Sequence, residues 1–369
     1  MLGKIINNLK RIDWLLFVNV FLLVLFGLAA IYSTTLNVGE ASIYNFAKQL
    51  IFFGVGLLFL FIFAFFDFRW FSSFYKFIYF LCLVALVLVL IFGKTLRGTT
   101  AWFGLGQLVI QPVEFIKIGF VIFLAKYLSD HAKEFVFLRH FFFTGLLTLL
   151  IVILIGLQPD LGSALIFIAI WLGMLYFTNL PKKYFLYLFV FILILAVLCW
   201  FFILQTYQKD RILNLLDPSR DPLGTGYNVH QSLIAIGSGQ FFGRGLGLGS
   251  QSQLNFLPEQ QTDFIFSVIA EELGFVGAMA VIVFFFLFFY RLIRIMKNSY
   301  DNFGNFLLLG FFLSLFAQFL INIGMNISLT PVVGVPLPFL SLGGSSLIAS
   351  LIIVGIIQSI IRINKESYF

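Results

Sequence analysis

Apolar segments of about 20 residues recur along the whole chain and are separated by short polar stretches. A helix that crosses the ~30 Å hydrocarbon core of a bilayer needs about 20 apolar residues, whereas a strand of a transmembrane barrel alternates in polarity over ~10 residues. The pattern therefore predicts an all-α polytopic membrane protein, with residues 1–369 forming a single membrane domain. Ten transmembrane helices are predicted near residues 14–32, 46–66, 74–93, 109–127, 141–157, 161–178, 184–205, 263–290, 304–327 and 338–361.

Composition and charge agree with this class and set the orientation. The sequence is 61% hydrophobic and only 11% charged, which is too little charge to cover a globular surface. The first apolar segment is longer than the core of a signal peptide, so we expect an uncleaved first helix. With the amino terminus inside, fifteen of the 23 Lys and Arg residues fall in cytoplasmic segments, as the positive-inside rule requires. We therefore predict cytoplasmic termini and, despite the net charge of +7, no nucleic-acid partner.

One large loop, residues 206–262, is predicted between the seventh and eighth helices. It is much longer than the ~12–15 residues beyond which a loop usually carries function or is disordered. Apolar patches alternate in it with turn signals such as DPSRDPLGTG. We therefore expect an ordered extracytoplasmic element with short helices.

Three acids, Asp263, Glu271 and Glu272, enter a segment that otherwise has the pattern of a membrane helix. An ionised carboxylate at membrane depth costs several kcal/mol unless it is paired or hydrated, so such acids are functional candidates. On a helix that begins at Asp263, Glu271 lies ~12 Å deeper and is rotated by ~80°, so both can border one cavity, whereas Glu272 turns further away. The structural alternatives are a helix-dipole partner for Asp263 and a partner of an intramembrane base for Glu271.

Two further clusters carry charge in predicted helices. Glu114 and Lys117 are spaced i, i+3 and can neutralise one another, either as functional groups or as a pair that stabilises the bundle. Asp160 opens a helix whose small residues allow close packing, which favours a structural role. Trp102 lies near the outer interface, where tryptophan serves more often as an anchor than as a substrate platform.

Two segments have backbone signals for an outward-facing site. Six glycines between Gly237 and Gly249 surround Arg244 and could form an anion nest for a pyrophosphate, or else a flexible hinge. Three prolines and paired glycines within residues 322–346 predict a broken helix beside a polar cavity.

The sequence shows no dedicated metal site. Both cysteines lie in apolar runs, and the three histidines, His131, His140 and His230, are scattered along the chain. We therefore predict no metal ligands and no certain cofactor, although a divalent cation could share the neutralisation of a pyrophosphate.

Eight motifs together resemble the SEDS family of shape, elongation, division and sporulation proteins, in order and over nearly the whole chain. The motifs are RIDWLL, IYSTT, RGTTAW, QPVEFIK, QPDLGSA, DPLGTGYNVHQSLIAIGSGQFFGRGLG, LPEQQTDFIFSVIAEELGFVG and GVPLPFLSLGGSS. The short amino terminus and the RIDW opening are more similar to the rod-shape branch than to the division branch. Val113, Ser328 and Leu342 depart from the usual pattern of the family, which leaves the acids untouched.

The resemblance implies an inverting peptidoglycan glycosyltransferase of the bacterial cytoplasmic membrane, which polymerises lipid II and releases undecaprenyl pyrophosphate. It implies Asp263 as the catalytic acid of the TDF motif, and Glu271, Trp102, Glu114, Lys117 and Asp160 as supporting or substrate-binding residues. Candidates for the leaving-group charge are Arg97, Lys117, Arg211 and Arg244. Implied partners are a class B penicillin-binding protein transpeptidase and other membrane proteins of the elongation complex.

A lipid II flippase is the alternative function, since broken helices and intramembrane charge also suit transport. A translocation path should place polar residues in both halves of the membrane. Here they gather in the outer half, and the sequence shows no obvious inverted repeat. The polymerase is therefore the favoured prediction.

Overall fold

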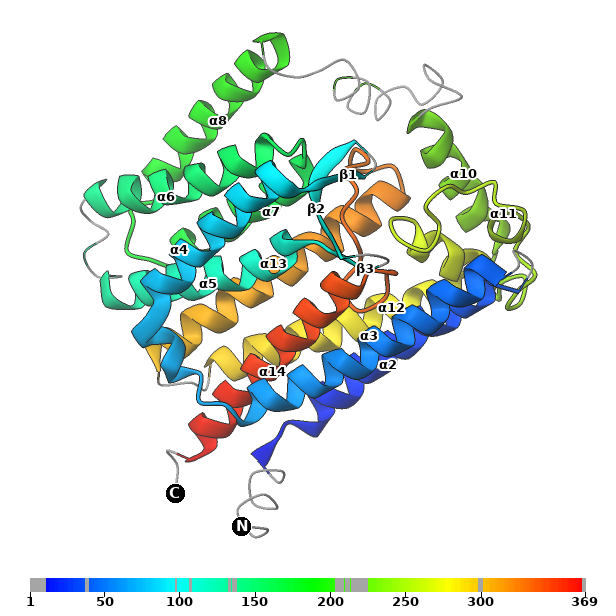
Figure 1. The fold of residues 1–369 in the computed structure, drawn as a ribbon, viewed down its shortest axis with the longest axis horizontal. Helices are drawn as coiled ribbons and strands as arrows, with labels where there is room; N and C mark the ends of the chain where they lie inside the picture. Colours follow the sequence, from blue (N-terminus) through cyan, green and yellow to red (C-terminus); the bar gives the residue numbers. More distant parts are fainter. Residues whose placement is uncertain are drawn as a thin grey trace.

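The computed structural model is a bundle of long helices, with a small sheet and the short helices of the large loop at one end (Figure 1). It describes residues 11–36, 40–96, 98–105, 108–131, 134, 138–202, 209, 213, 225–297 and 301–366. The helices are α2 (Trp14–Ser33), α3 (Glu40–Phe65), α4 (Arg69–Phe92), α5 (Pro112–His131), α6 (Leu138–Gly156), α7 (Leu161–Tyr176), α8 (Lys183–Phe202), α10 (Thr225–Ser238), α11 (Ser250–Gln253), α12 (Ile265–Lys297), α13 (Asn302–Asn326) and α14 (Gly344–Glu366). The strands are β1 (Lys94–Leu96), β2 (Thr99–Leu105) and β3 (Leu108–Ile110).

A helix lies at each of the ten predicted places, so the all-α membrane fold class is confirmed. Within the described residues, seven helices are long and apolar enough to cross a membrane by length and composition: α2, α3, α4, α6, α12, α13 and α14. Of the others, α5 carries four charged side chains and α7 has only 16 residues. The count of ten membrane crossings stays a prediction.

Aspartate side chains cap the amino-terminal ends of three helices. An aspartate carboxylate before the first turn accepts a backbone N–H that has no partner within the helix. Asp13 Oδ1 accepts from Leu16 N at 3.1 Å, Asp160 Oδ1 from Ser163 N at 3.0 Å, and Asp301 Oδ2 from Gly304 N at 3.1 Å. These caps fix where α2, α7 and α13 begin.

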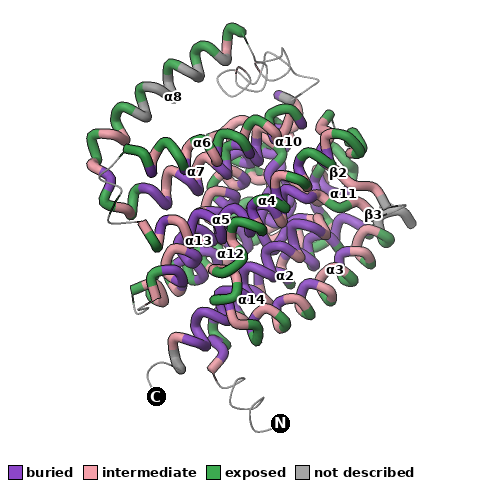
Figure 2. Tube along the Cα trace, turned by 60° about the vertical axis from the view of Figure 1, so that its left-hand side comes forward, coloured by how far each residue is buried: buried purple, intermediate pink, exposed green. Residues whose placement is uncertain are grey.

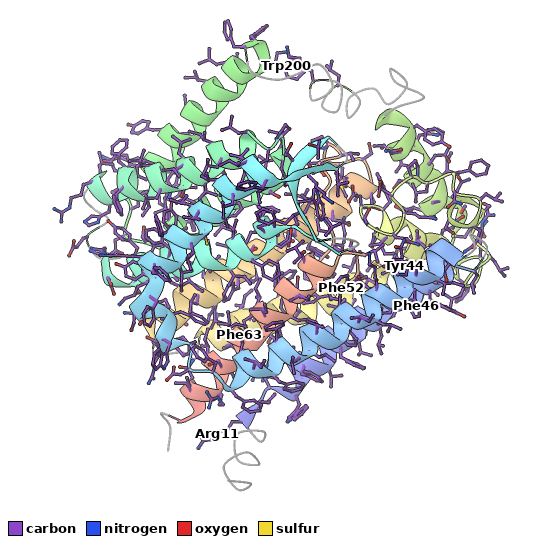
Figure 3. All side chains as sticks on the ribbon, viewed as in Figure 1. Arg11, Tyr44, Phe46, Phe52, Phe63 and Trp200 are labelled. Atoms are coloured by element: carbon purple, nitrogen blue, oxygen red, sulfur yellow. The ribbon has the colours of Figure 1, made fainter. Side chains whose placement is uncertain are left out.

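Helix α14 is the most deeply buried of the membrane-length helices and packs along α3 and α5 (Figure 2). Small residues let the backbones approach closely: a Cβ on Gly355 would lie 2.5 Å from the carbonyl oxygen of Leu60 in α3. Phe52 and Phe63 of α3 pack on the same helix near Gly344 and Gly355 (Figure 3). Around this centre, α12 packs on α2, and α13 packs on α5 and α7.

The small antiparallel sheet, with strand order β1-β2-β3, connects α4 to α5. The hydrophobic pattern did not predict these strands. Gly98, with φ 79°, makes the turn between β1 and β2, and Trp102 pairs with Lys94 across them. The sheet is therefore a local elaboration that does not change the fold class.

Residues 225–262, the continuously described part of the large loop, contain the expected short helices, α10 and α11, which pack on α12. Helix α8 extends away from the other helices in both views (Figures 1 and 2). The loop helices thus cover the end of the bundle where α12 begins.

Candidate functional site

Asp263 lies in the turn that precedes α12, two residues before the helix begins at Ile265. Its N–H donates to the carbonyl oxygen of Glu259 at 3.1 Å. Its own carbonyl oxygen accepts from Asn322 Nδ2 and from Asn326 Nδ2, both at 3.0 Å. The peptide of Asp263 is therefore held from both sides, which fixes the origin of its half-buried side chain.

The two asparagines of α13 join Asp263 to the broken segment, residues 327–343. Asn322 Nδ2 also donates to the carbonyl oxygen of Val335 at 2.8 Å. A Cβ on Gly334, which has φ 69°, would lie 3.6 Å from Asp263 Oδ2, so the carboxylate lies against this glycine. Sequence reasoning missed this role of Asn322 and Asn326, although their i, i+4 spacing places two amides on one helix face.

The broken segment between α13 and α14 is confirmed, and polar side chains satisfy its backbone. Ser341 Oγ accepts from Leu337 N at 2.8 Å and donates to the carbonyl oxygen of Thr262 at 2.5 Å. Gln49 of α3 bonds to the Ser341 carbonyl oxygen and to Gly343 N. Residues 338–343, which the hydrophobic pattern assigned to the last span, therefore belong to the broken segment, and α14 begins at Gly344.

The helix that Asp160 caps packs on the same segment. The Asp160 carboxylate accepts from Ser163 N and Ser163 Oγ, at 3.0 and 2.7 Å. A Cβ on Gly162 would lie 2.6 Å from the carbonyl oxygen of Val333, so the start of α7 packs directly on residues 333–335. The start of α7 and the carboxylate of Asp263 thus both contact residues 333–335.

The electrostatic surroundings of Asp160 connect it to α5. Enclosure by protein raises the pKa of the Asp160 carboxyl, while the Ser163 hydrogen bonds lower it. The charges of Glu114 and Lys117 also act on this carboxyl, in opposite directions. The structure therefore brings the QPD acid and the E-x-x-K pair into one electrostatic neighbourhood.

Glu114 and Lys117 form a buried ion pair with 2.8 Å between Oε2 and Nζ. The Lys117 Nζ makes no hydrogen bond of good geometry among the described residues, so the pair is held by charge. Gln111 N, one turn earlier, donates to Ser345 Oγ at 3.0 Å and fixes the start of α5 to α14.

Glu271 and Glu272 are both buried and both hold the glycine-rich loop. Glu271 accepts from Gln251 N at 2.8 Å and Ser252 N at 3.0 Å, at the start of α11. Glu272 accepts from Ser33 Oγ at 2.5 Å. The helical wheel predicted that Glu272 turns away, but Gly247 N donates to its carboxylate at 3.3 Å, so Glu272 lies against the same loop as Glu271.

Backbone hydrogen bonds also join the glycine-rich loop to α12 just before its kink at Gly274. Arg244 N and Gly245 N donate to the carbonyl oxygens of Glu271 and Glu272, each at 3.0 Å. Further N–H groups of the loop, at 247, 251 and 252, donate to the two carboxylates. The anion in this backbone nest is therefore the protein's own pair of acids.

Arg244 and Trp102 are the remaining predicted residues that the structure describes. The exposed Arg244 side chain bonds to Ser238 O and Ser250 Oγ, at 3.3 and 3.0 Å. Trp102 lies on β2, and Thr100 N of the same strand donates to the carbonyl oxygen of Gln158 at 3.3 Å. Arg97 and Arg211 lie outside the described residues.

An apolar cavity of about 420 Å³ opens between α3, α4, α5 and α14. Its lining includes Phe63, Cys82, Pro112, Phe115 and Ile356. Because Pro112 is in the same turn as Glu114, the hydrocarbon-like cavity begins beside the charged start of α5. Such an arrangement suits an amphiphile with an apolar chain and a charged head group.

Comparison with known proteins places the chain in a family. Residues 13–366 match the cell cycle protein family of FtsW, RodA and SpoVE. The chain is 35% identical over 360 residues to the stage V sporulation protein E of Bacillus subtilis, covering 96% of this chain and 98% of that protein. It is 38% identical over 295 residues to the peptidoglycan glycosyltransferase MrdB of Escherichia coli K12, covering 79% of each.

Solved structures agree in fold. One chain of a peptidoglycan synthase complex that coordinates polymerization and crosslinking superposes with a TM-score of 0.80 and 31% identity, covering 96% of this chain and 98% of that one. The rod shape determining protein RodA of Thermus thermophilus has a TM-score of 0.71 and 29% identity, covering 96% and 97%. The chain belongs to the SEDS family of FtsW, RodA and SpoVE proteins.

Proposed function

We propose that this protein is a peptidoglycan glycosyltransferase that polymerises lipid II into β-1,4 glycan strands during cell elongation, with Asp263 as the general base. The observation that carries the assignment is the fixed position of Asp263, whose peptide is held by Asn322 and Asn326. Relatives named as peptidoglycan glycosyltransferases support the reaction class. A preorganised carboxylate is what a base needs, because it must meet a hydroxyl proton at ~2.6–3.2 Å.

In the proposed step, the 4-hydroxyl oxygen of the acceptor N-acetylglucosamine bonds to the anomeric carbon of the donor N-acetylmuramic acid. The bond from that carbon to the pyrophosphate oxygen breaks, and undecaprenyl pyrophosphate leaves with the electron pair. Asp263 takes the hydroxyl proton. Attack from the face opposite the leaving group inverts the α-linked donor into a β-linked product.

Basic residues are proposed to stabilise the leaving pyrophosphate. Among the described candidates, Arg244 is exposed, whereas Lys117 is buried against Glu114. The charges of Glu114 and Lys117 act on Asp160, whose helix packs on the broken segment, and the apolar cavity beside Pro112 supports binding of a polyprenyl chain. Glu271 and Trp102 are proposed to shape the site, Glu271 by holding the glycine-rich loop.

The proposed setting is the bacterial cytoplasmic membrane, with both termini on the cytoplasmic side. A class B penicillin-binding protein is the proposed partner, because glycan strands need crosslinking and a similar chain is part of a complex that couples the two activities.

The test is glycan formation from purified lipid II by the purified protein with its transpeptidase partner. We expect Asp263→Asn to lower the rate by ~10²–10⁴-fold, the usual contribution of a general base. Asp130→Asn is the matched control, since this carboxylate pairs with Lys126 at the far end of α5. Full activity in Asp263→Asn would refute the base assignment. No polymer from wild type, together with lipid II crossing a bilayer, would favour the flippase.

A further inference from the structure

Two of the three histidines, which looked scattered in the sequence, meet at the end of the bundle that is remote from Asp263. His131 ends α5 and His140 lies in the first turn of α6, with ring centroids 5.0 Å apart. Glu134, in the connection between these helices, brings its carboxylate to the same place. One ligand atom from each of the three residues lies within 4.8 Å of the others.

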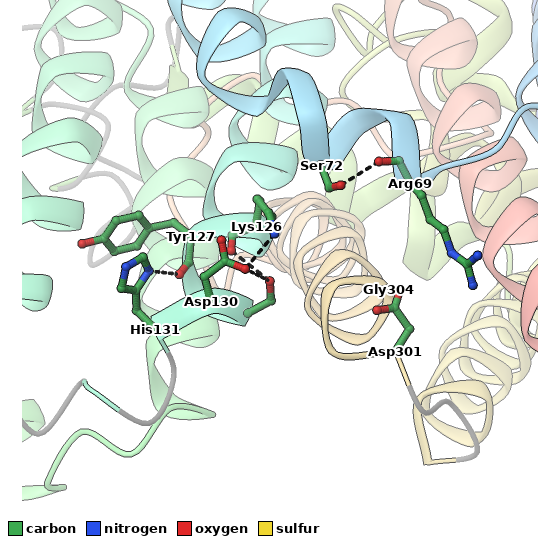
Figure 4. Close-up of polar contacts among 9 residues, drawn as sticks. Arg69, Ser72, Lys126, Tyr127, Asp130, His131, Asp301 and Gly304 are labelled. Carbon is green, nitrogen blue, oxygen red and sulfur yellow. Dashed lines mark hydrogen bonds and ion pairs between the residues drawn. The ribbon is translucent and has the colours of Figure 1, made fainter.

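Tyr127 forms a hydrogen bond with each of the two imidazoles, and in both rings the nitrogen involved is Nδ1. His131 Nδ1 lies 2.9 Å from the backbone carbonyl oxygen of Tyr127 (Figure 4), and His140 Nδ1 lies 2.9 Å from its hydroxyl oxygen. A hydrogen bond at Nδ1 is the usual outer contact of a metal-binding histidine, because it fixes the ring and directs Nε2 to the metal. The outer contacts of a two-histidine site are thus already built.

Arg139 holds a positive charge at this position. Its Nε donates to His140 Nε2 at 3.0 Å, and its guanidinium lies 3.4 Å from Glu134 Oε2. A nitrogen that accepts this bond presents a lone pair, which is what a metal ligand needs. The Arg139 side chain is 72% exposed, so it can swing into solvent and leave the lone pair and the carboxylate to another cation.

We propose that His131, Glu134 and His140 bind a divalent transition-metal ion, with Zn²⁺ as the favoured ion. Two imidazoles and a carboxylate are common zinc ligands, with a water in the fourth position. Ligand atoms around a tetrahedral zinc are roughly 3.3 Å apart. His140 Nε2 and Glu134 Oε2 are already 3.2 Å apart, so only His131 has to move closer.

The site is separate from the proposed catalytic centre and does not depend on that function. His131 is seventeen residues after Glu114, which is ~26 Å along the axis of α5. The start of α4 at Arg69 and the start of α13 at Asp301 lie at this same end (Figure 4). A bound ion would crosslink α5 to α6 and stiffen this end of the bundle.

The experiment measures Zn²⁺ and Co²⁺ binding to the full-length protein, purified in detergent with a histidine-free tag. We expect one equivalent of Zn²⁺ per chain, a visible Co²⁺ spectrum of low-symmetry coordination, and a higher thermal midpoint with Zn²⁺. Glu134→Gln removes a charged ligand and should weaken binding by at least the roughly 10–100-fold that loss of an outer contact costs, and His131→Ala/His140→Ala should abolish it. His230→Ala, which alters the third histidine on α10, should bind as wild type does.

Arg139→Ala separates a metal site from a merely structural cluster. It removes the competing positive charge, so Zn²⁺ binding should tighten by roughly tenfold. The thermal midpoint without metal shows whether each variant is folded. Wild-type protein that takes up no Zn²⁺ or Co²⁺, or binding that persists unchanged in His131→Ala/His140→Ala, would overturn the proposal.

Discussion

At the scale of residues, the buried pair of Glu114 and Lys117 leaves a structural and a catalytic role open, and the two roles predict different outcomes. Either Glu114→Gln or Lys117→Met leaves one buried charge without its partner, which should destabilise the fold by ~3–5 kcal/mol. The double variant removes both charges and should recover most of that stability. Thermal unfolding in detergent measures the effect.

Polymerisation by the same variants decides the role. If the pair serves only the bundle, the double variant should regain activity with its stability; a folded but inactive double variant would place the pair in the reaction. The exposed pair of Lys126 and Asp130, also on α5, is the control, and its loss should cost only ~0.3–0.5 kcal/mol.

At the scale of elements, the kink of α12 depends on glycines that face each other. Gly274 has φ 67° and ψ −163°, a conformation open almost only to glycine, and it packs against the backbone of Gly243. Gly274→Ala should therefore cost at least ~1–3 kcal/mol and, by loosening the loop that Glu271 holds, reduce polymerisation. Gly237→Ala, in α10 with open space around it, should be neutral or slightly stabilising. Equal thermal midpoints for the two variants would contradict this account of the kink.

At the scale of the whole molecule, the helices were predictable because a bilayer imposes one length on every crossing, and the broken segment because its prolines and glycines cannot continue a helix. Contacts between distant segments were not. The clamp of Asn322 and Asn326 on Asp263 depends on the packing of α13 against the turn before α12. The meeting of His131 and His140 depends on the contact between the end of α5 and the start of α6. The i, i+4 spacing of the two asparagines places them on one helix face but does not identify Asp263 as their partner, and the two histidines leave no periodic signal.

A polar junction joins three helices at the end of the molecule that is remote from Asp263. Asp13, before α2, exchanges two backbone hydrogen bonds with Gln358 of α14, at 2.9 and 3.0 Å. Its carboxylate also pairs with Arg291 of α12 at 2.7 Å. Asp13 therefore connects α2 to α12, which carries Glu271 and Glu272, and to α14, which follows the broken segment.

Asp13→Asn keeps the helix cap and both backbone hydrogen bonds but removes the negative charge that pairs with Arg291. Because the Asp13 carboxyl is buried and Arg291 is partly exposed, we expect a loss of ~1–3 kcal/mol, measured as a lower thermal midpoint. Asp301→Asn is the control, since Asp301 caps α13 through the same kind of bond and asparagine also caps well. A midpoint for Asp13→Asn equal to that of Asp301→Asn would show that the ion pair adds nothing beyond the cap. A lower midpoint with normal polymerisation at low temperature would show that the junction stabilises the bundle without taking part in the reaction.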